Sequence, residues 1–159
     1  MNREILFRAK STYDGEWIEG LYIRDIENKN RHRIQPLENW RFPVYVNPDT
    51  ICQYIGEKDV NGCKVYENDI VMCFNNPYYL AKVVFGEFDV VDGDTDRCVD
   101  TVKGWYFEII PNTLKGNKHI ISYTLPISKY YINAYNMKVI GNTFDSKRLI
   151  GETKDGESR

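Results

Sequence analysis

The sequence has no long hydrophobic run and no apolar leader segment. No stretch approaches the roughly 18 apolar residues that a transmembrane helix needs, so the residues predict no membrane span. The first eight residues carry charged side chains where a secretion signal would have its apolar core. These two absences predict a protein of the cytoplasm, with no membrane partner.

Cysteine is scarce and widely spaced. The four cysteines are Cys52, Cys63, Cys73 and Cys98, with no C-x-x-C pair and no neighbouring histidine cluster. Zinc knuckles need closely spaced ligand pairs, and a reducing compartment keeps isolated thiols free. We therefore expect free thiols, no metal site and no cofactor.

Motifs of catalysis are also missing. The only histidines, His32 and His119, lie far apart in polar segments, and there is no Gly-x-Ser-x-Gly elbow, H-E-x-x-H pair or Walker loop. Residues 92–96 begin like a calcium loop, but Arg97 and Lys103 stand where glycine and glutamate are required, which favours an acidic hairpin loop. We expect no enzyme, although an enzyme of unknown reaction stays open as an alternative.

A strong charge of one sign is lacking too. There are 21 basic and 23 acidic residues, for a net charge of −2, which argues against a global field that would attract nucleic acid. One local stretch nevertheless combines basic and aromatic side chains, as proteins that bind single strands do. The candidate nucleic-acid-binding residues in it are Arg24, Arg31, Arg33, Trp40 and Arg41. The other reading of this stretch is a solvated loop.

Aromatic residues are plentiful, at 14% with 12 tyrosines, and they favour strands. Short apolar runs separated by turn signals predict strands at residues 3–9, 16–23, 44–46, 53–56, 69–74, 78–85, 99–110, 120–125 and 138–142, with a further one after a polar loop at 27–33. Tyr13-Asp14-Gly15 predicts a hairpin turn, and Asn61-Gly62 predicts a hairpin with a type I′ turn.

Helical signals are few. Asn47 followed by Pro48 predicts one helical turn. Residues 128–136 suggest a short helix capped by Ser128, and residues 145–150 a final helical turn ended by Gly151. The pattern predicts a mainly β (β-rich α+β) fold, a small barrel or sandwich of about nine short strands with two or three helical turns. We expect one domain over residues 1–151 and a disordered polar tail over 152–159.

Three segments resemble the YopX family of bacteriophage and prophage proteins. The first is residues 3–9, and the third, residues 139–144, reads V-I-G-N-T-F where the family has V-I-G-N-I-Y. The second, residues 47–71, is similar to the family pattern P-x-T-V-G-Q-Y-T-G-x-x-D-x-N-G-x-x-I-Y-E-G-D-I-V. The matching residues of this family core include Pro48, Gln53, Tyr54, Gly56, Asn61, Gly62, Tyr66, Glu67, Asp69, Gly141 and Asn142.

Three residues depart from the family pattern, and the turn geometry that the pattern requires remains possible with them. Leu6 stands for the usual lysine, Cys52 for a glycine, and Asn68 for the glycine before Asp-Ile-Val. Asparagine is the next best residue at positive φ, so the turn at Asn68 remains feasible. We expect a structural role for the family core, with Asp69 accepting backbone hydrogen bonds and Tyr54 and Tyr66 covering the interior.

The resemblance implies a β-dominated fold and a phage or prophage origin, and it implies no activity. We expect a non-catalytic accessory protein that binds a host or phage protein, because aromatic residues are enriched at interface cores. A small β-barrel that binds nucleic acid is the alternative. Association with further copies of the chain is plausible because β-rich chains must cover their edge strands.

Overall fold

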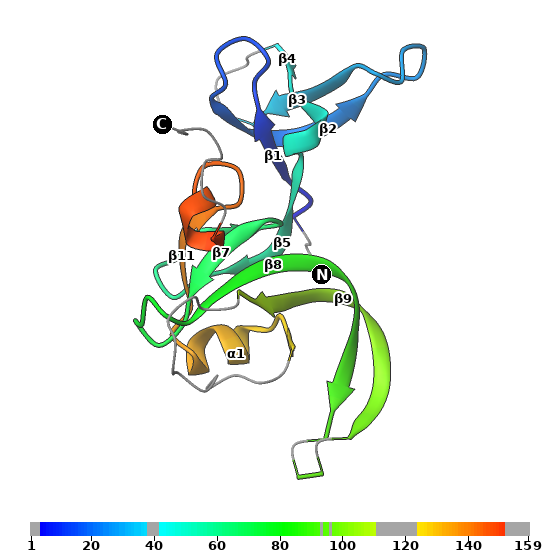
Figure 1. Ribbon diagram of the computed structural model, residues 1–159. Helices are drawn as coiled ribbons and strands as arrows, with labels where there is room; N and C mark the ends of the chain where they lie inside the picture. The colour runs from blue at the N-terminus through cyan, green and yellow to red at the C-terminus, as the bar shows by residue number, and fades with distance from the viewer. Residues whose placement is uncertain (1–3, 38–41, 93, 96, 111–123, 152–159) are drawn as a thin grey trace, which may run out of the picture. The chain divides into compact units, whose positions relative to one another are not determined.

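A computed structural model describes residues 4–37, 42–92, 94–95, 97–110 and 124–151 (Figure 1). The chain divides into two compact units, residues 1–56 and residues 57–159, which we describe separately. The expected single domain over 1–151 stays a prediction, and the expected tail over 152–159 lies outside the described residues. None of the described helices is long and apolar enough to cross a bilayer.

The first unit is an antiparallel sheet. Its elements are β1 (Phe7–Lys10), β2 (Trp17–Arg24), β3 (His32–Pro36), β4 (Val44–Tyr45), the 3-10 turn η1 (Pro48–Thr50) and β5 (Cys52–Lys58). The strand order is β4-β3-β2-β1-β5, and β5 crosses into the second unit, where β6 (Lys64–Tyr66) follows it. The inner face of the sheet carries the buried Ala9 and Ile34, and Val46 packs with them.

Local signals set the connections of this unit as expected. The β1–β2 hairpin turns at residues 13–15, where Gly15 has φ 75° and the Asp14 carboxylate accepts the Glu16 N–H at 3.1 Å. Asn47 caps η1 by accepting the Asp49 N–H at 3.0 Å. Pro48 occupies the first turn. Its lack of an N–H costs no hydrogen bond there, because the first N–H groups of a helix have no acceptor within it.

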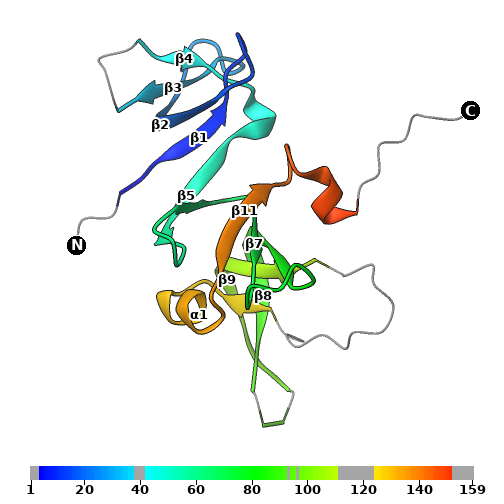
Figure 2. The ribbon, with the colours of Figure 1, turned by 90° about the vertical axis from the view of Figure 1, so that its left-hand side faces the viewer.

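The second unit holds a five-stranded antiparallel sheet of order β10-β9-β8-β7-β11. Figures 1 and 2 show the short helix beside this sheet. Phe107, Ile70, Val83, Ile132 and Met137 are almost completely buried. The elements are β7 (Asp69–Met72), β8 (Leu80–Val91), β9 (Cys98–Ile109), β10 (Leu125–Pro126), α1 (Lys129–Ala134), β11 (Lys138–Asn142) and the 3-10 turn η2 (Lys147–Ile150).

The β-rich fold is confirmed, while its details differ from the sequence prediction. The described residues form eleven strands in two antiparallel sheets, against the predicted small barrel or sandwich of about nine strands, and neither sheet closes into a barrel. The strand predicted at 44–46 forms as β4, and Leu125, the last residue of the strand predicted at 120–125, lies in β10. The helix at Ser128 and the last helical turn before Gly151 are confirmed. The expected loop after Ile110 and most of the expected strand at 120–125 lie outside the described residues.

Two predicted turns need correction. The Asn61-Gly62 hairpin forms, but only Gly62 has positive φ, and the Gly62 N–H bonds the Asp59 carbonyl at 3.0 Å. This is a type I turn followed by a left-handed glycine, which replaces the expected type I′ turn. Residues 89–91, expected within an acidic turn, continue β8, because Val90 and Val91 fit the ladder opposite Asp100 and Cys98.

Candidate functional site

The segments that carry the family resemblance meet in one ladder of the second unit. β7 and β11 pair antiparallel, with Val71 opposite Val139, Ile70 opposite Gly141 and Asp69 opposite Asn142. The register shifts between Val139 and Gly141, which marks an irregularity at that point. Two motifs far apart in the sequence therefore build one continuous structural element.

Asp59 ties the β5–β6 hairpin to β11. Its Oδ1 accepts the N–H groups of Asn61 at 2.8 Å and of Cys63 at 2.9 Å, and its Oδ2 accepts the N–H of Val139 at 2.9 Å. Only 6% of Asp59 is exposed. A buried carboxylate that accepts three backbone bonds stabilises both the turn and the position of β11. Sequence reasoning missed this role, although Asp59 stands at a matching position of the family pattern.

The turn between β6 and β7 has the geometry expected of it. Asn68 has φ 63°, and the buried Asp69 carboxylate accepts the Tyr66 N–H at 2.8 Å. The backbone of Asn68 also joins two other segments, donating to the Val83 carbonyl at 2.9 Å and accepting from the Thr143 N–H at 3.0 Å. The turn therefore fixes the backbone position of Thr143, just after β11.

Gly141 and Asn142 shape the segment after β11. A β-carbon at Gly141 would overlap the Ser146 side chain, which would have to shift, so glycine suits this close approach. Asn142 Oδ1 accepts the N–H groups of Phe144 at 3.0 Å and Asp145 at 2.9 Å, while its Nδ2 donates to Asp145 at 3.1 Å. These bonds fold residues 143–146 into a compact turn that leads into η2.

The other family-core residues lie in β5 and its surroundings. Tyr54 and Tyr66 are buried, at 5% and 3% exposed, as expected. Gln53 and Glu67 are half-buried, and Gly56 has φ 94° within β5.

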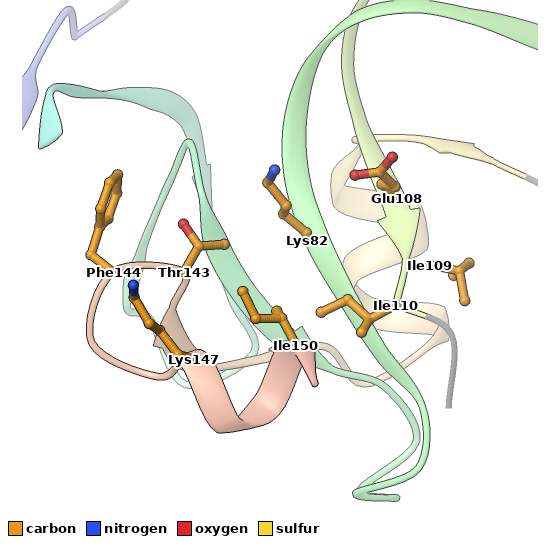
Figure 3. Close-up of a pocket in the computed structure, with 8 residues that line it drawn as sticks. All are labelled: Lys82, Glu108, Ile109, Ile110, Thr143, Phe144, Lys147 and Ile150. Carbon is orange, nitrogen blue, oxygen red and sulfur yellow. The ribbon is translucent and has the colours of Figure 1, made fainter. Parts of the chain in front are cut away.

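Beside the turn after β11 lies a pocket of about 700 Å3 (Figure 3). Lys82 reaches it from β8 and Glu108 from β9, and these two residues face each other across the ladder. Neither side chain makes a hydrogen bond or ion pair with another described residue. The remaining walls are Ile109, Ile110, Thr143, Phe144, Lys147 and Ile150. The pocket combines two ammonium groups, one carboxylate and one hydroxyl with an apolar lining. No sequence motif predicted it.

The described members of the predicted nucleic-acid set, Arg24, Arg31 and Arg33, do not gather on one surface. Arg24 pairs with His32 in the β2–β3 ladder, on the face that also carries Ile34. Arg33 lies one residue along β3 and therefore on the opposite face, where it contacts Asp25 at 3.4 Å. Arg31 is exposed in the preceding turn, and Trp40 and Arg41 lie outside the described residues.

A different basic and aromatic surface forms on the outer face of the first unit's sheet. The Arg8 guanidinium lies 4.8 Å and Lys10 Nζ 5.5 Å from the centre of the Trp17 ring. On the same face, the Arg33 guanidinium lies 5.8 Å from the Tyr45 ring centre. We call these five residues the outer-face cluster. Side chains that alternate along β1, β2 and β3 bring these residues together. The cluster could not be predicted from the sequence, because that requires the register of the strands.

The β8–β9 hairpin extends well beyond the rest of its sheet (Figures 1 and 2). We call its outer part, residues 84–91 and 98–105, the arm. Among the described residues, β7 pairs with β8 from Leu80 to Lys82, and Ile127 is the last residue to bond the other edge, at the Trp105 carbonyl. Past these points the described residues supply no third strand to the arm.

The cysteines differ in accessibility. Cys52 and Cys73 are buried, whereas Cys63 and Cys98 are exposed, and all four are free. Burial raises the pKa of the Cys73 thiol to about 11, so this thiol is protonated at neutral pH. His32 accepts or donates a 2.6 Å hydrogen bond between its Nδ1 and the Tyr22 hydroxyl, and no group of three or more metal-ligating side chains occurs among the described residues.

These features define a strand-rich protein with two antiparallel sheets. Residues that match the family pattern hold the β7–β11 ladder and its turns in place. The family model of the YopX protein matches residues 6–151. The chain belongs to the YopX family. No curated protein matches the sequence.

Proposed function

We propose that this protein is a non-catalytic accessory protein of a phage or prophage, that it acts in the bacterial cytoplasm, and that it binds a host or phage protein through the arm. The observation that carries the proposal is the open two-stranded construction of the arm. A two-stranded ribbon is at best marginally stable in water and becomes stable when another surface covers it. The N–H and C=O groups along its edges, which no described residue pairs, are also suited to a partner strand.

The arm presents apolar side chains to solvent. On one face, Phe85 is 49% exposed and packs edge-on against Trp105, with ring centres 5.0 Å apart. Val99 is 64% exposed nearer the tip of the arm, where the register of the ladder shifts. A partner with an apolar recess would bury these groups, and aromatic anchors of this kind contribute much of the affinity at protein interfaces.

The other face of the arm is internally packed. Phe88 is 7% exposed, and its ring lies 5.2 Å from that of Tyr106, beside the opposed pair Gly86 and Gly104. On the face that carries Phe85, Thr101 donates a 2.9 Å hydrogen bond to Asp89, its partner in the ladder. These contacts support the arm as a shaped element that can present Phe85 and Val99 to a partner.

The test is a tagged capture from a bacterial host lysate treated with nuclease. The Phe85→Ser, Val99→Ser double variant should lose the proteins that the wild type retains. Tyr130→Ser is the matched control, because Tyr130 is 73% exposed and belongs to α1 rather than to the arm, and this variant should retain them. Retention of the same proteins by the arm variant would refute the proposal, and light scattering of both variants separates a second copy of this chain from a different partner.

The outer-face cluster favours a second candidate function, the binding of single-stranded nucleic acid. Three cations are interleaved there with the Trp17 and Tyr45 rings, an arrangement that serves both backbone charge and base stacking. Glu19 and Asp25 on the same side reduce the positive field, which is why we rank this function second. The third alternative, an enzyme, has no comparable support among the described residues.

Anisotropy of a labelled oligothymidylate at low salt tests the second candidate. The Lys10→Glu, Arg33→Glu double variant should weaken binding and reduce its salt dependence. Arg24→Glu makes one charge reversal on the opposite face and should have less effect. Equal losses in both variants, or no binding by the wild type, would remove the outer-face cluster as a nucleic-acid site.

A further inference from the structure

We infer that the pocket bounded by Lys82, Glu108, Thr143 and Lys147 binds a small organic carboxylate that carries an apolar body (Figure 3). This inference is independent of the arm and of the proposed function. It rests on the polar groups of the pocket, on its apolar walls, and on the residues that hold it open.

The polar groups favour an anion. Lys82 is half-buried, and it makes no hydrogen bond or ion pair with any other described residue, although Glu108 lies directly opposite in the ladder. A partly buried ammonium gains strongly from a charged acceptor. Lys147 contributes a second positive charge and Thr143 a hydroxyl donor from the facing wall.

The balance of charges selects the kind of anion. Two ammonium groups and one carboxylate give the lining a net charge of +1. A ligand with a single negative charge neutralises this lining, whereas a phosphate dianion would leave a negative charge next to Glu108. A carboxylate monoanion therefore fits better than a phosphate monoester.

The apolar walls require more than a bare anion. Ile110 and Ile150 present their side chains to the pocket beside the polar groups, and Phe144 and Ile109 complete the lining, although the Ile109 side chain points to the other face of β9 (Figure 3). The volume of about 700 Å3 lies within the range of small-molecule sites. A ligand that buries a short aliphatic or aromatic portion against these side chains gains hydrophobic free energy that acetate cannot.

The pocket wall is held by hydrogen bonds from the β6–β7 turn and from Asn142. Thr143 donates its N–H to the Asn68 carbonyl, and Asn142 fixes the N–H groups of Phe144 and Asp145. The two wall residues Thr143 and Phe144 therefore have defined backbone positions before any ligand arrives, and preorganisation of this kind lowers the cost of binding.

Amide NMR of the full chain tests the inference with four probes: hexanoate, hexanol, hexylamine and hexyl phosphate. Hexanoate should give saturable shifts at Thr143, Phe144 and Lys147, hexanol should bind more weakly, and hexylamine should not bind. Tighter binding of hexyl phosphate than of hexanoate would overturn the selection of a monoanion. Equal shifts with all four probes, or none with any, would overturn the site.

Lys82→Met keeps the length of the side chain and removes its charge. Hexanoate should bind this variant about tenfold more weakly or worse, because a charge-assisted hydrogen bond is lost. Lys103→Met is the matched control, since Lys103 is exposed on the arm, and its affinity should equal that of the wild type. If Lys82→Met fails to fold by circular dichroism, Lys147→Met provides the same test. Unchanged affinity in the folded variant would refute the inference.

Discussion

The Asp59 carboxylate accepts a hydrogen bond from the backbone N–H of Val139 at 2.9 Å, across 80 positions of the chain. The same carboxylate closes the hairpin turn through Asn61 and Cys63. One side chain therefore couples a local turn to the most distant strand pairing of its unit.

Asp59→Ala should lower the free energy of unfolding by about 3–5 kcal/mol, because three backbone donors lose a charged acceptor. Asp59→Asn should cost less, about 2 kcal/mol, since the amide retains one acceptor oxygen. Urea denaturation followed by circular dichroism measures both. Asp49→Asn, at an exposed position, is the control. An Asp59→Ala protein as stable as this control would contradict the coupling.

Gly141→Ala should destabilise the protein by about 2–3 kcal/mol, because the added methyl group overlaps Ser146 and must displace the turn after β11. Gly104→Ala adds the same methyl group to another strand, where the nearest atom is Phe88 Cε1 at 3.9 Å, an ordinary contact. Thermal unfolding of the two variants should therefore give clearly different midpoints. Equal midpoints would show that Gly141 has no steric role.

A thiol reagent added to the native protein should modify Cys63 and Cys98 rapidly. Cys52 and Cys73 are 0% exposed and should react only through unfolding. Mass spectrometry of peptides from a time course identifies which thiols react. Rapid modification of Cys73 in the native state would contradict the burial that the structure gives it.

The Cys73 thiol also links stability to pH. Its pKa is about 11 in the folded protein against an ordinary value of 9.0, so the unfolded chain loses this proton first as the pH rises. The stability that the thiol contributes is present below pH 9 and is lost between pH 9 and about 11.

Between pH 8.5 and 10.5 the wild type should therefore lose about 1–2 kcal/mol more stability than Cys73→Ala, as measured by urea denaturation. Cys63→Ala keeps the buried thiol and should follow the wild type. A Cys73→Ala protein with the same alkaline loss as the wild type would refute this linkage.

Local features of the fold could be predicted from the sequence. The caps at Asn47 and Ser128, the hairpin at Asn61-Gly62 and the positive φ at Asn68 each depend on groups within a few residues. The sequence placed the β7 and β11 strands but not their pairing, because a strand pattern does not name its partner. The role of Asp59 was missed for the same reason, because one of the N–H groups that its carboxylate accepts belongs to the distant Val139.

The site could be predicted less well than the fold. The pocket draws its residues from β8, β9, the turn after β11 and η2, and no single segment carries its signature. The basic stretch was visible, but Arg24 and Arg33 fall on opposite faces because their strands pair with a register that the sequence did not reveal. The same register assembles the outer-face cluster from residues as early as Arg8.

The pairing of β7 with β11 also affects how the protein folds during its synthesis. Residues 69–72 leave the ribosome well before residues 138–142, and at ordinary rates of translation the interval is on the order of several seconds. During that time β7 can pair with β8 but has no partner on its other edge. Every newly made chain thus passes through a state in which one edge of β7 is unpaired. The yield of folded protein depends on the rate of elongation relative to the rate of aggregation.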